Sequence, residues 1–285
     1  MIDLHMHTTA SDGVLTPAAL MDRAFAVGIR TLSVTDHDTM AGIADAAAAA
    51  ASHGMEFLPG IEITAVDNQR DVHMLAYFLD PDPPGLASFL VDQRSDRSRR
   101  AREMSEKLAG LGVPIDIDDL ISVAEADGKA VGRPSVAQAL VDAGHVVSVQ
   151  EAFGRWLADD GAAYVPRVGV SPTDVVRLVA RNGGVSALAH PKLLRKDDLV
   201  PSLAKAGLGA IEVYHSQHAT SDESHYLRLA EQYQLAVCGG SDFHGDQYHR
   251  AKRFGKVGVP RERFVLLLQR LLQAHSMVHG EAPSV

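Results

Sequence analysis

Two histidines stand in the segment IDLHMHTTASDG, near the start of the chain. Residues two apart in an extended strand point to the same side, so His5 and His7 can reach one metal ion. Asp242 and His244 repeat this spacing in the segment GGSDFHG. Neutral imidazole and carboxylate are the groups that divalent metals bind. The two segments therefore predict metal ligation.

Five more residues of these types accompany short apolar runs: Asp12, His37, Glu62, His73 and His190. In parallel α/β folds, ligands gather at the carboxyl ends of strands, and most of the candidates stand there. His73 is the exception, since it lies near the start of its run. One ion needs only three or four ligands. Nine candidates therefore indicate two or three ions that share carboxylates, as in sites that hydrolyse phosphate esters.

Seven apolar runs must position these residues. Strands are expected over residues 2–7, 31–37, 57–65, 72–79, 185–190, 210–215 and 236–244. Helical segments lie between many of them, and Thr16 and Ser171 are expected to cap two helices that begin at prolines. Strands that alternate with helices predict an α/β fold with a parallel sheet, open or closed into a barrel.

The alternation breaks from about residue 84 to 170, where helical signals occur without a convincing buried strand. One long helix is expected in LASFLVDQRSDRSRRAREMSEKLAGLG, followed by three shorter ones. We predict a helical insertion domain over residues 100–166, within a barrel formed by residues 1–99 and 167–285. Five arginines crowd the long helix and are expected to form a solvated face: Arg94, Arg97, Arg99, Arg100 and Arg102.

The chain has 285 residues and a formal net charge of −9. This acidic balance argues against a general nucleic-acid coat. The sequence has neither a signal-peptide pattern nor an apolar stretch of about 18 residues, so no membrane span is expected. The single cysteine, Cys238, fits a reducing compartment. A cytoplasmic location is therefore predicted.

These motifs resemble the PHP (polymerase and histidinol phosphatase) family of metal-dependent phosphoesterases. DLHMHTTASDG is similar to its first motif, VTDHDT to its second, GIEIT and DVHMLAYF to its third region and SDFH to its last. The sequence is most similar to the stand-alone branch that includes 3′,5′-nucleotide bisphosphate phosphatases and a 5′-to-3′ trimming exoribonuclease (RNase AM). The resemblance implies a distorted (β/α)₇ barrel with a small helical insertion.

Carried over by position, the resemblance implies three metal sites. The first would be held by His5, His7, Glu62 and Asp242. Glu62 would bridge to a second ion, held also by His73 and His190. The third would be held by Asp12, His37 and His244. The family uses manganese, iron or zinc; we expect two or three divalent ions, with manganese as the first choice.

The segment VGRPSVAQAL resembles a family motif in which the arginine grips phosphate. Arg133 is therefore expected to clamp phosphate, since a guanidinium matches phosphate oxygens in pairs. Ser135 stands where relatives often have histidine. The expected substrate-binding residues are Arg133, Ser135, His215 and His218. Asp36 is expected to orient a histidine ligand.

The implied reaction is removal of the 3′-phosphate from a 3′,5′-nucleotide bisphosphate, with trimming of short RNA as a related activity. Metal-activated water would attack the phosphate, and Arg133 would neutralise charge on it. The proton donor to the leaving group stays open between a metal-bound water, His190 and His215. The expected partners are a small nucleotide or a short RNA end, without long duplexes or membranes; the oligomeric state stays open. Three alternatives remain: a histidinol phosphate phosphatase, a metal-dependent amidohydrolase and a non-catalytic metal-binding module.

Overall fold

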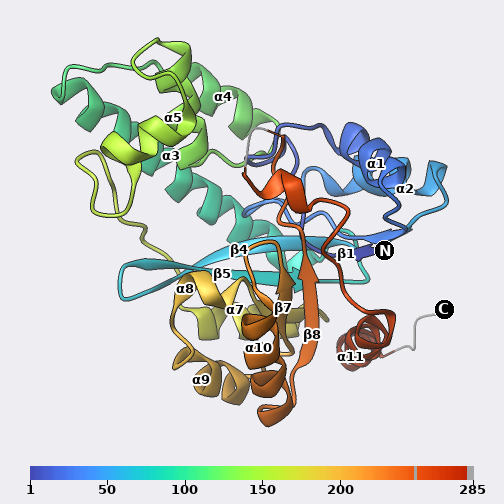
Figure 1. The fold of residues 1–285 in the computed structure, drawn as a ribbon. Helices are drawn as coiled ribbons and strands as arrows, with labels where there is room; N and C mark the ends of the chain where they lie inside the picture. Colours follow the sequence, from blue (N-terminus) through green and yellow to red (C-terminus); the bar gives the residue numbers. More distant parts are fainter. Residues whose placement is uncertain (247–248, 281–285) are drawn as a thin grey trace.

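The computed structural model describes residues 1–246 and 249–280. Its strands form two sheets (Figure 1). The first holds three short parallel strands in the order β1–β2–β3: β1 (Ile2–Asp3), β2 (Thr31–Leu32) and β3 (Glu56–Phe57). The second has the order β4–β5–β6–β7–β8: β4 (Gly60–Asp67), β5 (Arg70–Tyr77), β6 (Val185–Leu188), β7 (Ala210–His215) and β8 (Ala236–Gly240). The α/β class is confirmed.

Isolated bridges join the two sheets on both sides. Met6, beyond β1, bridges Phe243, beyond β8, in a parallel sense. His37, beyond β2, bridges Glu62 of β4, also in parallel. The strands thereby form a connected circuit, but it is not a regular (β/α)₇ barrel. The expected third strand is divided into β3 and β4, and β4 passes directly into β5 with no helix between them.

The expectation of a wholly parallel sheet is wrong for β5, which runs antiparallel to both β4 and β6. Asn68 and Gln69 form the turn between β4 and β5 with positive φ angles of 49° and 65°. Two successive residues of positive φ make the tight turn whose twist suits an antiparallel hairpin. The reversal explains the odd position of His73. Because β5 is reversed, its start lies at the edge where the neighbouring β6 ends, and Ala189 N donates to His73 O.

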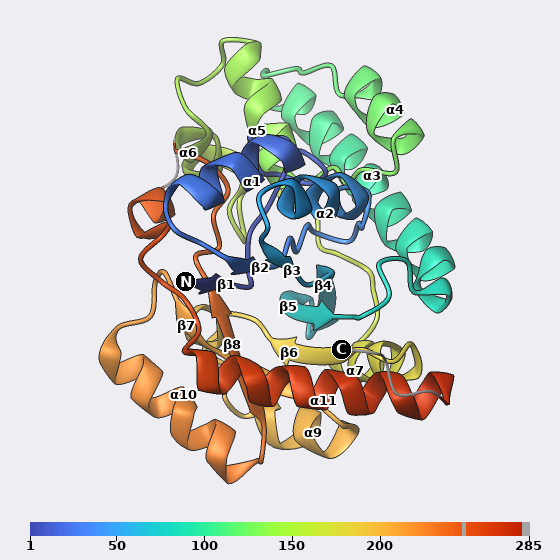
Figure 2. The same cartoon turned by 90° about the vertical axis from the view of Figure 1, so that its right-hand side faces the viewer.

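Helices cover the sheets on several sides (Figures 1 and 2). The helices α1 (Pro17–Ala26) and α2 (Ile43–Ser52) pack on the first sheet, and α11 (Arg261–His279) packs along β8 and β6. The second sheet is covered by α7 (Pro172–Arg181), α9 (Leu199–Ala206) and α10 (Thr220–Gln232), next to the short α8 (Pro191–Leu194). Thr16 and Ser171 cap α1 and α7 as predicted, accepting hydrogen bonds from Ala19 N and Asp174 N.

The middle of the chain is helical, as predicted. After a 3-10 turn (Pro84–Leu86) come α3 (Ala87–Gly110), α4 (Asp118–Ala126), α5 (Arg133–Asp142) and α6 (Val149–Ala152), which continues as a π-helical turn (Phe153–Leu157). These helices have a hydrophobic cluster of their own, drawn from residues 101–165. Leu90 of α3, by contrast, packs in the main core, so α3 enters both cores without a break. The separate cluster supports a helical subdomain, and its boundaries stay a prediction.

A further 3-10 turn spans His249–Arg253. No helix among the described residues is both long enough and apolar enough to cross a membrane.

Candidate metal centre

The first and last strands bring their paired ligands side by side. His7 N donates to Phe243 O at 3.0 Å, and Asp242 N donates to His5 O at 2.8 Å. This backbone register places the two segments in contact just beyond β1 and β8. His5 and His7 are both completely buried, and their rings lie 5.2 Å apart. The paired spacing seen in the sequence therefore forms one corner of the site.

Glu62 on β4 is the centre of the cluster. Its Oε1 lies 2.9 Å from His73 Nδ1 and 3.0 Å from His190 Nε2. Its Oε2 lies 3.2 to 3.3 Å from ring nitrogens of three further histidines: His5, His7 and His37. Ligands of one metal ion stand about 3.0–3.4 Å apart, since metal–nitrogen bonds are about 2.1 Å long. The spacing around Glu62 is therefore that of a shared coordination sphere.

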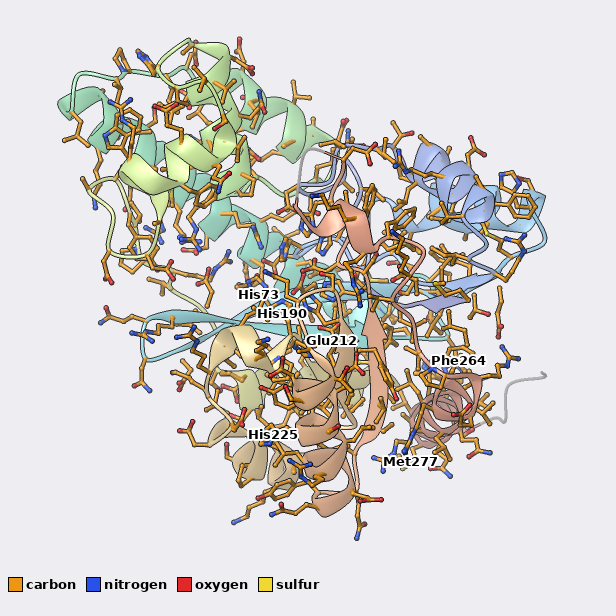
Figure 3. The ribbon with its side chains drawn as sticks, viewed as in Figure 1. His73, His190, Glu212, His225, Phe264 and Met277 are labelled. Atoms are coloured by element: carbon orange, nitrogen blue, oxygen red, sulfur yellow. The ribbon has the colours of Figure 1, made fainter. Side chains whose placement is uncertain are left out.

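In Figure 3, the labelled His73 and His190 lie next to each other, with Glu212 close below them. The ring centroids of His73 and His190 are 5.2 Å apart. Burial alone would raise the pKa of Glu62, but the surrounding His37, His73 and His5 outweigh it and hold the pKa well below its usual range. The Glu62 carboxylate is thus charged, as a bridging ligand must be.

Asp12 gathers a second group of ligands. Its Oδ1 lies 3.3 Å from His244 Nε2 and 3.5 Å from His7 Nδ1, and its Oδ2 lies 3.8 Å from His37 Nε2. Asp12 thus faces the cluster rather than solvent. Three sets of atoms are close enough for one ion each: His7, Asp12, His37 and His244; His5, His7 and Asp242; and His37, Glu62 and His73.

These sets differ in detail from the assignment that the resemblance implies. His7 stands with Asp12 as well as with His5, because its two ring nitrogens face opposite ways. His37 joins Glu62 and His73 in the set expected to contain His190, which still lies 3.0 Å from Glu62. All nine predicted ligands are brought together in one place. Which ion each would bind stays a prediction.

The ring nitrogens give an independent test of whether the residues fit a metal. Buried polar atoms in proteins nearly always have a hydrogen-bond partner. Within residues 1–246 and 249–280, both nitrogens of His7, Nδ1 of His37 and Nδ1 of His190 are buried without one. Carboxylate oxygens lie near His7, but not in hydrogen-bonding geometry. Close ligands that do not point at one another fit a shared cation.

Carboxylates behind the cluster hold the ligands in place. Glu212 on β7 accepts from the His190 backbone N–H at 2.6 Å and lies 2.9 Å from His5 Nδ1. Such contacts fix the ring orientation of a ligating histidine. Glu212 was not among the predicted site residues, although its place in the strand-end segment EVYH is a signal for such a role. Asp36 behaves differently from its prediction, since it accepts hydrogen bonds from Thr8 and Ser11 rather than from a histidine.

His215 and His218 do not line the cavity beside the cluster, contrary to prediction. His215 is fully buried, with Nε2 3.1 Å from Asp242 Oδ2, so it supports a ligand from behind. His218 lies 2.7 Å from Val213 O and packs beside Tyr226. His215 is the last residue of β7, and His218 lies in the loop between β7 and α10. His215 is therefore out of place as a proton donor to a substrate.

A cavity of about 490 Å³ opens beside the cluster, and four arginines line it: Arg97, Arg100, Arg133 and Arg167. Arg133 lines this cavity, as predicted. Ser135 was also predicted to bind substrate, but it does not line this cavity. Its hydroxyl accepts a hydrogen bond from Gly132 N at the start of α5, and its side chain faces other surface hollows.

Arg97 and Arg100 correct the expectation of a solvated arginine face, because both are buried. Arg97 Nε donates to Asp38 at 2.6 Å, and Arg100 donates to the Val165 carbonyl. Arg167, which the sequence did not single out, lies 3.5 Å from Asp38. Burial lowers the pKa of Arg167 to about 10, and the positive charge of Arg97 acts in the same direction. The guanidinium groups around the cavity therefore lie close enough for their positive charges to repel one another.

An outer cavity of about 640 Å³ adjoins the first and shares His73, Arg133 and His190 with it. Its walls combine polar and apolar groups. The β4–β5 turn forms one wall; Tyr164, Leu193 and Leu194 add aromatic and apolar surface. A metal cluster, an arginine-lined cavity and a mixed outer cavity together suit a phosphorylated organic molecule.

An α/β fold with nine clustered histidine and carboxylate side chains is typical of metal-dependent hydrolases. Comparison with known proteins gives the family. The family model of the PHP domain matches residues 3–145, and the chain belongs to the PHP family.

The chain is similar to three proteins with phosphoester chemistry. It is 34% identical over 250 residues to a 3′,5′-nucleoside bisphosphate phosphatase of Chromobacterium violaceum, covering 85% of this chain and 87% of that protein. It is 34% identical over 251 residues to the 5′-3′ exoribonuclease Rnm of Escherichia coli, covering 85% and 84%. A solved structure from Bifidobacterium adolescentis, assigned provisionally to the metal-dependent phosphoesterases, has a TM-score of 0.85 at 33% identity, covering 94% and 96%. The chain is a hydrolase acting on phosphoric ester bonds.

Proposed function

We propose that the chain removes the 3′-phosphate from 3′,5′-nucleotide bisphosphates, giving nucleoside 5′-monophosphates, and that it also trims short RNA in the 5′-to-3′ direction. The observation that carries this proposal is the arginine-lined cavity. Three of the four guanidinium groups lie near carboxylates, those of Asp38, Asp71 and Asp159, of which Asp159 is largely exposed. The fourth, Arg100, donates to the Val165 carbonyl. This excess of buried positive charge beside the metal cluster suits a substrate with a second phosphate.

Some of the site residues would bind the metal ions and the substrate, and others would position the reacting groups. Metal ions held by the nine ligands would polarise the phosphoryl oxygens and activate water. Arg133 would grip the phosphate that stays on the product. His190 lines both cavities, and its backbone N–H is fixed by Glu212, so its ring is held beside the place where the reacting ester would lie. The two similar relatives named for nucleotide and RNA substrates support this choice.

The rival substrate, histidinol phosphate, fits the charges less well. It carries an ammonium group and an imidazole, and the four arginines around the cavity would repel a cation. A non-catalytic role is disfavoured by the complete set of nine ligand groups around Glu62 and Asp12. A cytoplasmic location stays a prediction.

A substrate panel tests the proposed function. We expect kcat/KM to be highest for a 3′,5′-bisphosphate, lower for nucleoside 3′- and 5′-monophosphates, and very low for histidinol phosphate. Short 5′-phosphorylated RNA should release mononucleotides from its 5′ end. A preference for histidinol phosphate over every nucleotide would reject the proposal.

We expect Asp12→Ala to lower the metal content by about one ion per chain, because Asp12 belongs to only one of the three ligand sets. Metal analysis after dialysis measures the stoichiometry, and kcat should fall with it. Asp22→Ala, at an exposed position beside His53, is the control and should retain both metal and activity. Full activity of Asp12→Ala at matched metal content would rule out a three-ion centre.

A further inference from the structure

The guanidinium of Arg133 already holds an anion from its own chain. Its Nη1 donates to Asp159 Oδ1 at 2.6 Å and to Leu157 O at 3.3 Å. Its central carbon lies 5.4 Å from the ring centre of Tyr164 and 5.9 Å from that of Phe153. The aromatic rings hold the guanidinium, while Asp159 occupies one of the N–H groups that a phosphate would use.

The Asp159 carboxylate is exposed and can separate from Arg133 at little energetic cost. The Asp159 side chain is 74% exposed, against 22% for Arg133. Ion pairs with such an exposed partner contribute little to stability, because water competes for the carboxylate. Asp159 also lines both cavities, so rotation of its side chain alone would open the guanidinium to a ligand. A phosphate binds a guanidinium through two parallel hydrogen bonds and carries more charge than a carboxylate.

We propose that Asp159 is a displaceable counter-ion that competes with the substrate and product for Arg133. This inference rests on the proposed function in one respect, the assignment of Arg133 as the phosphate clamp. Asp159 weakens binding of any ligand that places a phosphate on Arg133. When the product is bound, the carboxylate can retake its N–H group, which favours release of the nucleoside 5′-monophosphate.

Calorimetric titration of nucleoside 5′-monophosphate tests the competition without requiring turnover. We expect Asp159→Asn to bind it about three- to five-fold more tightly than the natural chain, the range set by the strength of an exposed ion pair. The unphosphorylated nucleoside should bind both proteins equally. In turnover, Asp159→Asn should show a lower KM for the bisphosphate and stronger product inhibition.

Asp160→Asn is the matched control. Asp160 is the adjacent acid, is also exposed and makes no ion pair with the described part of the chain. The same charge change there should alter binding much less. An Arg133→Gln background gives the second control, because Asp159→Asn should then have no effect if the two residues act as a pair.

Three outcomes would overturn the inference: unchanged affinity in Asp159→Asn, weaker affinity, or an equal gain in Asp160→Asn. Weaker affinity would mean that Asp159 positions Arg133 for phosphate instead of competing with it. Failure of the proposed function would look different. The natural chain would then show no preference for bisphosphates in turnover, whatever the titrations give.

Discussion

Replacing Glu62 with glutamine should remove the bound metal and, with it, the activity. The Glu62 carboxylate lies within 3.3 Å of ring nitrogens of five histidines, and glutamine would offer them a neutral amide instead. Residues that only support ligands cost about 10- to 100-fold in metal affinity when they are replaced. We expect Glu62→Gln to exceed that range and to reduce kcat by at least the same factor. Metal analysis after dialysis and initial rates at saturating bisphosphate measure the two effects.

Glu212→Gln is the informative control for Glu62→Gln. Glu212 orients His5 and the His190 backbone but contributes to none of the three ligand sets. Its replacement should lower metal affinity by about 10- to 100-fold and leave activity recoverable when metal is added in excess. If Glu62→Gln retained its metal and responded to excess metal as Glu212→Gln does, Glu62 would not be a bridging ligand.

The second large effect is on stability and concerns Asp38. This buried carboxylate, with a positive φ of 52°, accepts from Arg97 Nε at 2.6 Å and faces Arg167 at 3.5 Å. Burial alone would raise the pKa of Asp38, but Arg97 and Arg167 outweigh it and keep the pKa lowered. Asp38→Asn would leave the buried Arg97 guanidinium without its carboxylate partner, and Arg167 would keep only Asp71, 3.6 Å away. We expect the free energy of unfolding to fall by about 3–5 kcal/mol.

Denaturant titration measures this loss. The control is Glu103→Gln, which removes an exposed partner of Arg99 on the same helix, α3, and should cost less than about 1 kcal/mol. Replacing Arg97 by methionine in the Asp38→Asn background should restore part of the stability, because it removes one unpaired charge. Equal, small losses in Asp38→Asn and Glu103→Gln would show that the buried network does not stabilise the fold.

The clustering of the nine candidate ligands could be predicted from the sequence because their signal is local. His5 with His7 and Asp242 with His244 show their spacing within three residues, and strand ends converge in any sheet of this kind. His73 is also a histidine, but it lies near the start of its strand, where a parallel sheet would place it far from the other ligands. Only the direction of β5, set by the turn at Asn68 and Gln69, brings it to Glu62.

Of the four arginines that line the cavity, only Arg133 could be predicted, because what buries the other three side chains lies far away in the sequence. Arg97 and Arg99 look alike in the sequence of α3, yet Arg97 is buried against Asp38 and Arg99 is only half-buried beside Glu103. Arg100 is held by the carbonyl of Val165, 65 residues further on. His215 shows the reverse error: a histidine at a strand end, whose ring supports Asp242 from behind.

The β4–β5 hairpin has a consequence for how this enzyme could evolve. Its strands carry Glu62 and His73 in fixed register, while its tip walls the outer cavity. Inserting one residue within a strand would turn every following side chain to the opposite face and dismantle the centre. Lengthening the tip would change the entrance and leave both ligands in place. New substrate preferences could therefore arise at this hairpin by duplication and drift, while the inherited chemistry stays intact.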